Sequence, residues 1–230
     1  TLSERLESVD SILQSGFRVL KTSCGRGSLQ DQTELVVALS DAIGDRGELT
    51  VDAHGAFDVS DALQFAKFLE GLGNVLWLED PLIPEDHDGY RELTQSTTLR
   101  IAMGETECNR YGVRDRLQGR ECNLLLPDVC RAGGISETLR IAQLADVFGV
   151  SWASHVSTST AMHLMAGIHV GAVTPNFLIS EFPTAFDQGP FGNVLLSDPI
   201  EVDAGQIQVN DKPGLGIELN QSEVEKLIVE

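Results

Sequence analysis

The sequence predicts an α/β fold, a (β/α) barrel of the TIM type, and three observations support this prediction. Short apolar runs rich in Val, Leu and Ile alternate with helical segments, which is typical of a parallel sheet covered by helices. Six residues able to bind a metal or transfer a proton each end such a run, where a barrel carries its catalytic groups. The gaps between them are 27, 26, 23, 27 and 26 residues, which suit a strand with its return helix. The six are Asp52, Glu79, Glu105, Asp128, His155 and Glu181.

Apolar spacing and turn residues indicate where the individual elements begin and end. Apolar residues at helical spacing predict a first helix over residues 2–14, which Gly16 stops. Asp61 suits the start of another helix, and Pro81 ends the strand before it because proline cannot donate to a ladder. The expected elements after the first helix are strand 17–22, helix 29–43, strand 48–52, helix 61–72, strand 74–79, helix 89–95, strand 99–103, helix 110–118, strand 123–126, helix 136–148, strand 150–153, helix 160–173 and strand 177–180.

The last part of the chain changes character and suggests a second segment. Residues 1–190 are expected to form the barrel, and residues 191–230 an irregular covering segment with β-like pieces at 193–196 and 206–209 and a short terminal helix. Seven strands are expected where a complete barrel has eight, and the chain opens on a helix. We therefore expect a first strand, and whatever preceded it, to lie outside this chain.

Composition restricts the partners and the compartment. The formal net charge is −19, from 35 acidic and 16 basic residues, which argues against nucleic acid or an anionic membrane as a partner. The four cysteines form no CxxC pair and no short disulfide framework, so reduced thiols in a cytoplasmic protein are expected. No apolar run approaches the ~18 residues of a membrane span, and no signal peptide is expected at Thr1.

Three carboxylates that end consecutive strands predict a metal site. Asp52, Glu79 and Glu105 would repel one another if held close together, so without a cation at least one would take up a proton. One Mg²⁺ would remove this repulsion, because it binds through a few carboxylates together with waters and a substrate oxygen. The alternative for each residue alone is an ordinary surface acid, but three in register favour the metal.

The next two strand ends predict a group that transfers protons. Asp128 and His155 end neighbouring strands, and a carboxylate bonded to one ring nitrogen raises the basicity of the other. His155 is therefore a candidate general base or acid. The alternative for a single histidine is a satisfied structural residue, which is what we expect of His163 and His169 because they lie in a helical pattern.

Three more residues are candidates for catalysis and substrate binding. His54 lies two residues beyond Asp52, so it would share the same face if the strand geometry continued. Lys21 ends the strand at residues 17–22, where its ammonium could neutralise a substrate carboxylate, although an exposed lysine is a serious alternative. Glu181 ends the last strand and could donate to, or orient, an enolate oxygen.

Eight stretches carry a resemblance to a known family: GFRVLKTSCG, LTVDAHGAF, VLWLEDPL, IAMGE, LLLPDVCRAGGISE, WASHVS, PNFLISE and PGLGIEL. Through them the chain resembles the barrel domain of the enolase superfamily, in its mandelate racemase and muconate lactonizing enzyme family. The resemblance implies a modified (β/α)7β barrel, a Mg²⁺ site at Asp52, Glu79 and Glu105, an acid/base dyad of Asp128 and His155, and Glu181 near an enolate. Such enzymes remove the proton α to a carboxylate, using a Lys or His base together with Mg²⁺.

One departure from the racemase pattern favours a dehydratase. Racemases of this family carry Lys-x-Lys on the second strand, whereas this chain has Lys21 followed by Ser23, which has no useful basicity near pH 7. The pair of Asp52 and His54 resembles sugar-acid dehydratases instead. The resemblance therefore implies dehydration of an aldonate or aldarate to a 2-keto-3-deoxy acid, with His54 and His155 sharing the acid and base roles. The alternatives are a racemase, epimerase or cycloisomerase of a hydroxy acid or lactone, and a remnant without catalytic activity.

A second departure concerns the cap of the barrel. Family members carry an α+β cap before the barrel, and residues 191–230 would complete it. The rest of the cap is expected on the same gene or on another chain, unless it has been lost. The expected partners are a small carboxylate or sugar-acid substrate and further copies of the chain in a homo-oligomer.

Overall fold

The computed structural model describes residues 1–157, 159–183, 186, 189 and 191–228. The chain divides into two compact units, which are described separately. Unit 1 contains Thr1–Met103, Asp115–Leu124 and Asp203–Gly205, and unit 2 contains Gly104–Arg114, Leu125–Val202 and Gln206–Glu230. The strand order β1-β2-β3-β4-β5-β6-β7 follows the order of the chain, as expected for a sheet built from strand–helix repeats.

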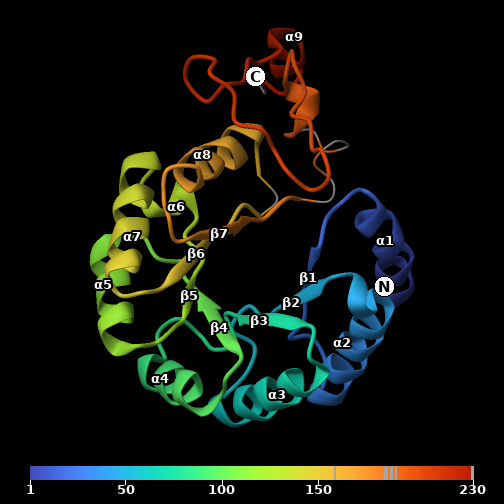
Figure 1. Ribbon diagram of the computed structural model, residues 1–230, viewed down its shortest axis with the longest axis vertical. Helices are drawn as coiled ribbons and strands as arrows, with labels where there is room; N and C mark the ends of the chain where they lie inside the picture. The colour runs from blue at the N-terminus through green and yellow to red at the C-terminus, as the bar shows by residue number, and fades with distance from the viewer. Residues whose placement is uncertain (158, 184–185, 187–188, 190, 229–230) are drawn as a thin grey trace. The chain divides into compact units, whose positions relative to one another are not determined.

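Unit 1 consists of parallel strands with a helix after each. Helices α2, α3 and α4 pack against strands β2, β3 and β4, on the outer side of the strands in Figure 1. The register places Asp52 opposite both Ser23 and Glu79, so three consecutive strands end at one level. The elements are α1 (Leu2–Gln14), β1 (Val19–Ser23), α2 (Leu29–Ile43), the 3₁₀ turn η1 (Gly44–Arg46), β2 (Glu48–Asp52), α3 (Val59–Leu72), β3 (Val75–Glu79), α4 (His87–Ser96) and β4 (Arg100–Met103).

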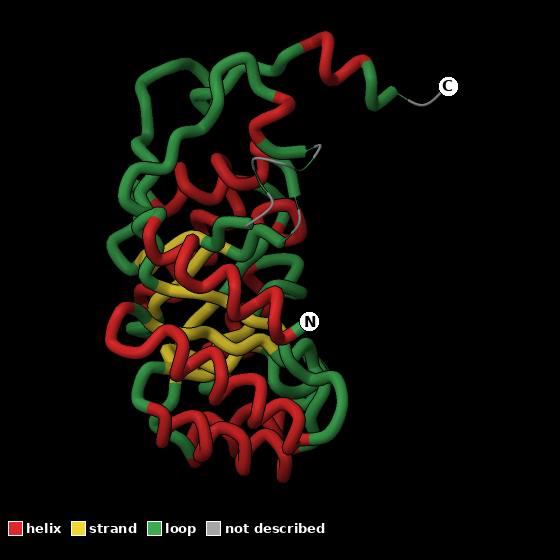
Figure 2. The backbone as a smooth tube through the Cα atoms, turned by 90° about the vertical axis from the view of Figure 1, so that its right-hand side faces the viewer, coloured by secondary structure: helices red, strands yellow, loops and turns green. Residues whose placement is uncertain are grey.

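Unit 2 repeats the pattern and then ends in a long irregular segment. After α5 (Arg110–Gly119) and β5 (Leu124–Leu125), which both units share, it contains parallel strands β6 and β7. The segment after β7 is mostly loop, drawn green in Figure 2, with α9 near the C-terminus. The elements are α6 (Val129–Ala132), α7 (Ile135–Val147), β6 (Ser151–Ser154), α8 (Ala161–Gly171), β7 (Phe177–Ser180), η2 (Asn193–Leu195) and α9 (Gln221–Glu225).

Local signals explain why these elements start and stop where they do. Ser28 and Asp31 form a reciprocal capping box at the start of α2, and the Thr160 side chain caps α8. Gly16 follows α1 with φ 95°, and a Cβ there would lie 2.4 Å from the Ala204 backbone, so only glycine fits. The helices and strands that the sequence predicts in residues 2–180 are all present, with ends that differ by one or two residues.

The predicted β-like pieces in the C-terminal segment form no strand, although Leu196 makes an isolated antiparallel bridge to Leu219. Residues 193–196 contain the 3₁₀ turn η2, and residues 206–209 form no strand. Their apolar residues are satisfied by packing on α8: Ile207 and Val209 contact the buried cluster that contains Leu164 and Met165. The short helix α6 was not predicted. The predicted boundary between residues 190 and 191 stays a prediction, and Pro190 lies outside the described residues.

No helix in the described part of the chain is both long and apolar enough to cross a membrane. The longest, α2, has 15 residues, whereas a spanning helix needs about 20.

Glu70 fixes the turn that leads into β4 and makes stability depend on acid pH. Its carboxylate accepts hydrogen bonds from the Thr97 hydroxyl at 2.6 Å, from the backbone and hydroxyl of Thr98, and from the Leu99 backbone at 3.1 Å. The Thr97 bond contributes most, and together these donors lower the pKa of Glu70 from 4.5 to about 2. The lowered pKa means that the carboxylate stabilises the fold above pH 4.5, and that this contribution is lost as the pH falls towards 2.

Glu70→Gln is therefore expected to lower the free energy of unfolding at pH 7 by about 1–2 kcal/mol, a value reduced for partial solvent exposure. The difference from the wild type should shrink as the pH falls from about 4.5 towards 2, because Glu70 is then protonated first in the unfolded and finally in the folded wild type. Urea unfolding at several pH values measures this difference. Glu92→Gln, at an exposed site on α4, is the control. A difference between wild type and Glu70→Gln that does not vary with pH would contradict the assigned role.

Candidate active site

In unit 1, the ends of three neighbouring strands bring together Lys21, Asp52 and Glu79. Lys21 lies opposite Thr50 in the register, and Thr50 faces the same side of β2 as Asp52 because the two are two residues apart. The Lys21 ammonium lies 2.9 Å from Asp52 Oδ2 and 2.7 Å from Glu79 Oε1. The Trp77 indole donates to Glu79 Oε2 at 3.2 Å. Two buried carboxylates thus share one ammonium, as the predicted positions at the strand ends require.

This cluster has the chemistry of a cation site. Both carboxylates are only 1% exposed, and Asp52 Oδ2 accepts no hydrogen bond, although it forms an ion pair with Lys21. Two buried carboxylates and one ammonium leave a net negative charge, which is costly away from water. An oxygen-seeking divalent cation such as Mg²⁺ would offset this negative charge. Asp52 and Glu79 therefore fit the predicted metal.

His54 lies beside Asp52, as predicted, but the predicted reason, continued strand geometry, is wrong. The strand ends at Asp52, and His54 adopts a left-handed backbone conformation with φ 49°, so the alternation along a strand does not place it. Its Nδ1 lies 3.1 Å from Asp52 Oδ1, and its backbone amide donates to the same oxygen at 3.1 Å. The ring Nε2 lies 3.3 Å from the Ser23 hydroxyl, and the side chain is 53% exposed. His54 thus combines a carboxylate partner with access to solvent.

In unit 2, His155 lies between two carboxylates. Its Nδ1 is 2.9 Å from Asp128 Oδ2, and its Nε2 is 3.0 Å from Glu105 Oε2. Asp128 is held in place because its other oxygen accepts from the backbone amides of Cys130 and Arg131 at 2.8 and 3.0 Å. The predicted pair of Asp128 and His155 is therefore in contact, and the residues also form a β-bridge.

These contacts determine the protonation of the dyad. Burial alone would lower the pKa of His155, but hydrogen bonds to Asp128 and Glu105 and the charge of Glu181 raise it to about 10. Burial would raise the pKa of Asp128, but hydrogen bonds from His155 and from the Arg131 amide outweigh this effect and lower it. His155 therefore holds a proton at neutral pH in this arrangement, and Asp128 is ionised.

Glu181 directly follows β7, as predicted, and its carboxylate contacts the start of the loop after β6. Its Oε2 accepts from the backbone amides of Val156 and Ser157 at 2.7 and 3.0 Å. These two donors fix the carboxylate next to the His155 backbone, which explains why its charge acts on the His155 ring.

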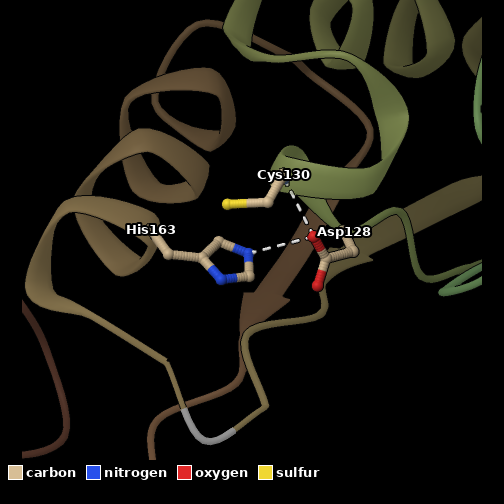
Figure 3. Close-up of side chains that lie close together, drawn as sticks. All are labelled: Asp128, Cys130 and His163. Atoms are coloured by element: carbon tan, nitrogen blue, oxygen red, sulfur yellow. Dashed lines mark hydrogen bonds and ion pairs between the residues drawn. The ribbon is translucent and has the colours of Figure 1, made fainter. Parts of the chain in front are cut away.

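The structure also brings in two residues that the sequence did not identify. Ser23 contacts His54, as described above. His163 Nε2 lies 3.5 Å from Asp128 Oδ1 and has no hydrogen-bond partner (Figure 3). Burial lowers the pKa of His163, which the Asp128 charge only partly offsets. His163 was expected to be satisfied within its helix; it is buried, but one ring nitrogen is not satisfied. His169 is satisfied, because its Nε2 bonds the Leu215 carbonyl at 3.1 Å.

The predicted site residues are thus divided evenly. Unit 1 holds Lys21, Asp52, His54 and Glu79, and unit 2 holds Glu105, Asp128, His155 and Glu181. Two of the three predicted metal ligands, Asp52 and Glu79, share Lys21, whereas Glu105 contacts His155. The roles of all eight residues stay predictions.

Comparisons with known proteins agree with these features. The family model for "Enolase C-terminal domain-like" proteins matches residues 4–224. D-xylonate dehydratase of Haloferax volcanii is 36% identical over 202 residues, covering 88% of this chain and 48% of that protein. D-galactarolactone cycloisomerase of Agrobacterium fabrum is 32% identical over 213 residues, covering 90% of this chain and 55% of that protein. The chain therefore spans about half the length of the curated relatives that it matches.

A solved structure extends the likeness to three dimensions. L-talarate dehydratase from Polaromonas sp. JS666, complexed with Mg and L-glucarate, is 26% identical to this chain with a TM-score of 0.85, covering 98% of this chain and 59% of that one. The parallel strands in chain order and this match confirm the predicted α/β barrel class. Because the family model spans almost the whole sequence, the chain belongs to the enolase C-terminal domain-like family of the enolase superfamily.

Proposed function

We propose that the protein is a Mg²⁺-dependent dehydratase that converts an aldonate or aldarate to a 2-keto-3-deoxy acid. The observation that carries this proposal is His155, held by Asp128 on one ring nitrogen and by Glu105 on the other. Such a group can move a proton at a fixed position. Relatives named as dehydratases of D-xylonate, D-gluconate and arabinonate support the substrate class.

Dehydration of a sugar acid needs two proton transfers, and the chain offers two histidines for them. The bond from C2 to hydrogen breaks, and the proton goes to a base. The C3 hydroxyl then leaves as water after it takes a proton from an acid, and the resulting enol becomes the 2-keto acid. His155 and His54 are the proposed pair, each oriented by an aspartate: Asp128 for His155 and Asp52 for His54. Which one is the base is left open.

The proposed metal is one Mg²⁺, with Asp52, Glu79 and Glu105 as ligands. It would stabilise negative charge on the substrate carboxylate as the α-proton leaves. The hydrogen-bond-free, buried Asp52 Oδ2 supports this choice, and so does the magnesium named in the talarate dehydratase complex. Lys21 is proposed to neutralise the substrate carboxylate, and Glu181 to orient the enolate oxygen.

A second candidate function is cycloisomerisation of a lactone. The relative named as a D-galactarolactone cycloisomerase, at 32% identity, favours this alternative. It would use proton transfer by His155 without loss of water, so the products separate the two functions: only dehydration yields a 2-keto-3-deoxy acid. A cytoplasmic location, from the cysteine pattern, and a homo-oligomer, from the resemblance, are further proposals.

The first experiment is a substrate screen in D₂O. The purified protein is incubated with Mg²⁺ and a library of aldonic acids, aldaric acids and their lactones, and NMR follows keto-acid formation and α-deuterium incorporation. Formation of a 2-keto acid supports the dehydratase. Deuterium incorporation or lactone conversion without keto acid replaces it by an isomerase. Absence of both with every compound contradicts the proposal for this chain and favours a remnant without catalytic activity.

Asp52→Asn is expected to weaken Mg²⁺ binding by at least about tenfold, equivalent to ~1.4 kcal/mol. The substitution removes one charge from a buried carboxylate whose Oδ2 accepts no hydrogen bond, so a cation loses a direct partner. Calorimetric titration with Mg²⁺ measures the change. Asp45→Asn, at an exposed position in η1, is the matched control and should leave the affinity unchanged. Equal affinities for Asp52→Asn and the wild type would remove Asp52 from the ligand set.

A further inference from the structure

Three side chains in unit 2 converge on one point beside the proposed dyad. Asp128 follows β5, Cys130 lies in α6 and His163 lies in α8, and Figure 3 shows that all three side chains point towards the same space. One ligand atom from each residue, a carboxylate oxygen, the thiol sulfur and an imidazole nitrogen, lies within 4.8 Å of the other two. None of the predicted Mg²⁺ ligands belongs to this set.

The second observation is the state of His163. Its side chain is only 3% exposed, and its Nε2 has no hydrogen-bond partner. Asp128 Oδ1 is 3.5 Å away, which is too far for a good hydrogen bond. That oxygen already accepts two backbone amides, from Cys130 and Arg131. A buried ring nitrogen without a partner is costly, and a bound cation would satisfy it.

The spacing and the donor types suit one class of cation. Two ligand atoms each about 2.1 Å from a tetrahedral ion are about 3.4 Å apart, close to the 3.5 Å between His163 Nε2 and Asp128 Oδ1. Cys130 is exposed, so its thiol can rotate to complete the set, and a water can occupy the fourth position. Thiolate and imidazole ligands select Zn²⁺ or a similar transition metal, whereas Mg²⁺ prefers oxygen ligands.

We propose that Asp128, Cys130 and His163 form a binding site for Zn²⁺ or a chemically similar divalent transition metal, separate from the proposed Mg²⁺ ligands. The site uses Asp128 Oδ1, whereas His155 is held by Oδ2. A cation on Oδ1 draws negative charge away from the side that orients His155. Occupancy is therefore expected to slow proton transfer. This last consequence rests on the proposed function, but the binding itself does not.

Co²⁺ is the probe that tests the site directly, because a cobalt–thiolate bond has a charge-transfer absorption that carboxylate and water ligands lack. The full chain is titrated with Co²⁺ under a non-thiol reductant, with excess Mg²⁺ present to occupy oxygen-only sites. The charge-transfer band should appear with saturation at one equivalent, and Zn²⁺ should displace it. This readout needs neither substrate nor turnover, so its failure is distinguishable from failure of the proposed dehydratase.

Two cysteine variants make the test specific. Cys130→Ser should abolish the charge-transfer band and weaken Zn²⁺ binding in calorimetry by at least about tenfold. Cys108→Ser removes another exposed thiol of unit 2 and should change neither quantity. His163→Gln should also weaken Zn²⁺ binding, and near-ultraviolet circular dichroism checks that this buried position remains folded. The proposal is overturned if the wild type shows no band, if Cys130→Ser keeps it, or if Cys108→Ser loses it.

Discussion

His155→Asn is expected to slow exchange of the substrate α-proton by about 10²- to 10⁴-fold, the range that a positioned acid or base contributes. Asn is close to His in size and can still bond Asp128, so the surrounding structure should persist. It cannot take up or release a proton near neutral pH, whereas the pKa of His155 is raised to about 10 by its carboxylate partners, against the effect of burial. The loss should therefore appear in the chemical step.

NMR of the substrate identified in the D₂O screen measures this exchange rate, and calorimetry measures Mg²⁺ affinity in parallel. Mg²⁺ affinity should change little, because His155 contributes no proposed metal ligand. His169→Asn is the matched control: it removes a hydrogen bond to the Leu215 carbonyl in the same unit. Unchanged exchange in His155→Asn would remove His155 from the mechanism. A similar loss in His169→Asn would show that the effect is one of stability.

Much of this fold could be predicted because each repeat carries its own local signals. Strand β2 was predicted at its exact bounds, since its apolar run is buried and ends at the charged Asp52. Helix α2 was likewise predicted exactly, since Ser28 caps its start and Gly44 follows its end. Capping, periodicity and turn residues act within a few positions, so the sequence displays them directly.

The C-terminal segment could not be predicted in the same way. Its alternating apolar residues looked like short strands, but Ile207 and Val209 pack against the cluster around α8 instead of pairing in a ladder. A period of two in a short segment says which residues are buried, but it does not say whether a partner strand exists.

In the candidate site, too, some contacts follow from the regular strand repeat, whereas others depend on tertiary packing that the sequence does not display. Lys21, Asp52 and Glu79 could be placed together because parallel strands end at a common level. His163 could not be placed beside Asp128, since the contact joins a helix to a strand end 35 positions earlier and no sequence period encodes it. His54 contacts Asp52 because its backbone adopts a positive φ. This conformation could not be predicted from the presence of a histidine at that position.

His87 contacts a further buried carboxylate with a structural role, that of Glu121. Its side chain is 48% exposed, but its Nδ1 lies 2.9 Å from Glu121 Oε2. Glu121 is completely buried in unit 1 and also pairs with Arg91 at 3.0 Å and Arg116 at 2.9 Å. Arg116, itself buried, donates to the Pro84 carbonyl at 2.6 Å. One carboxylate thus neutralises a buried guanidinium and ties α4, α5 and the loop before α4 together.

Glu121→Gln is accordingly expected to lower the free energy of unfolding by about 3–5 kcal/mol, the usual effect of removing one partner of a buried ion pair. The amide keeps the shape of the side chain but removes the negative charge that lies 2.9 Å from the buried Arg116 guanidinium. Urea unfolding followed by circular dichroism measures the change. Asp88→Asn removes the exposed partner of Arg91 and should cost less than about 1 kcal/mol, because solvent screens that pair.

A double substitution separates the effect on stability of removing one charge of the ion pair from the contribution of the pair as a whole. Replacing Arg116 by Met and Glu121 by Leu removes both charges of this ion pair, and such exchanges are often neutral or stabilising. The double variant should therefore be more stable than Glu121→Gln, even though it differs more from the wild type. If instead it is the less stable of the two, the pair contributes directly through its hydrogen bonds to Pro84 and His87, and the large effect of Glu121→Gln would need that explanation.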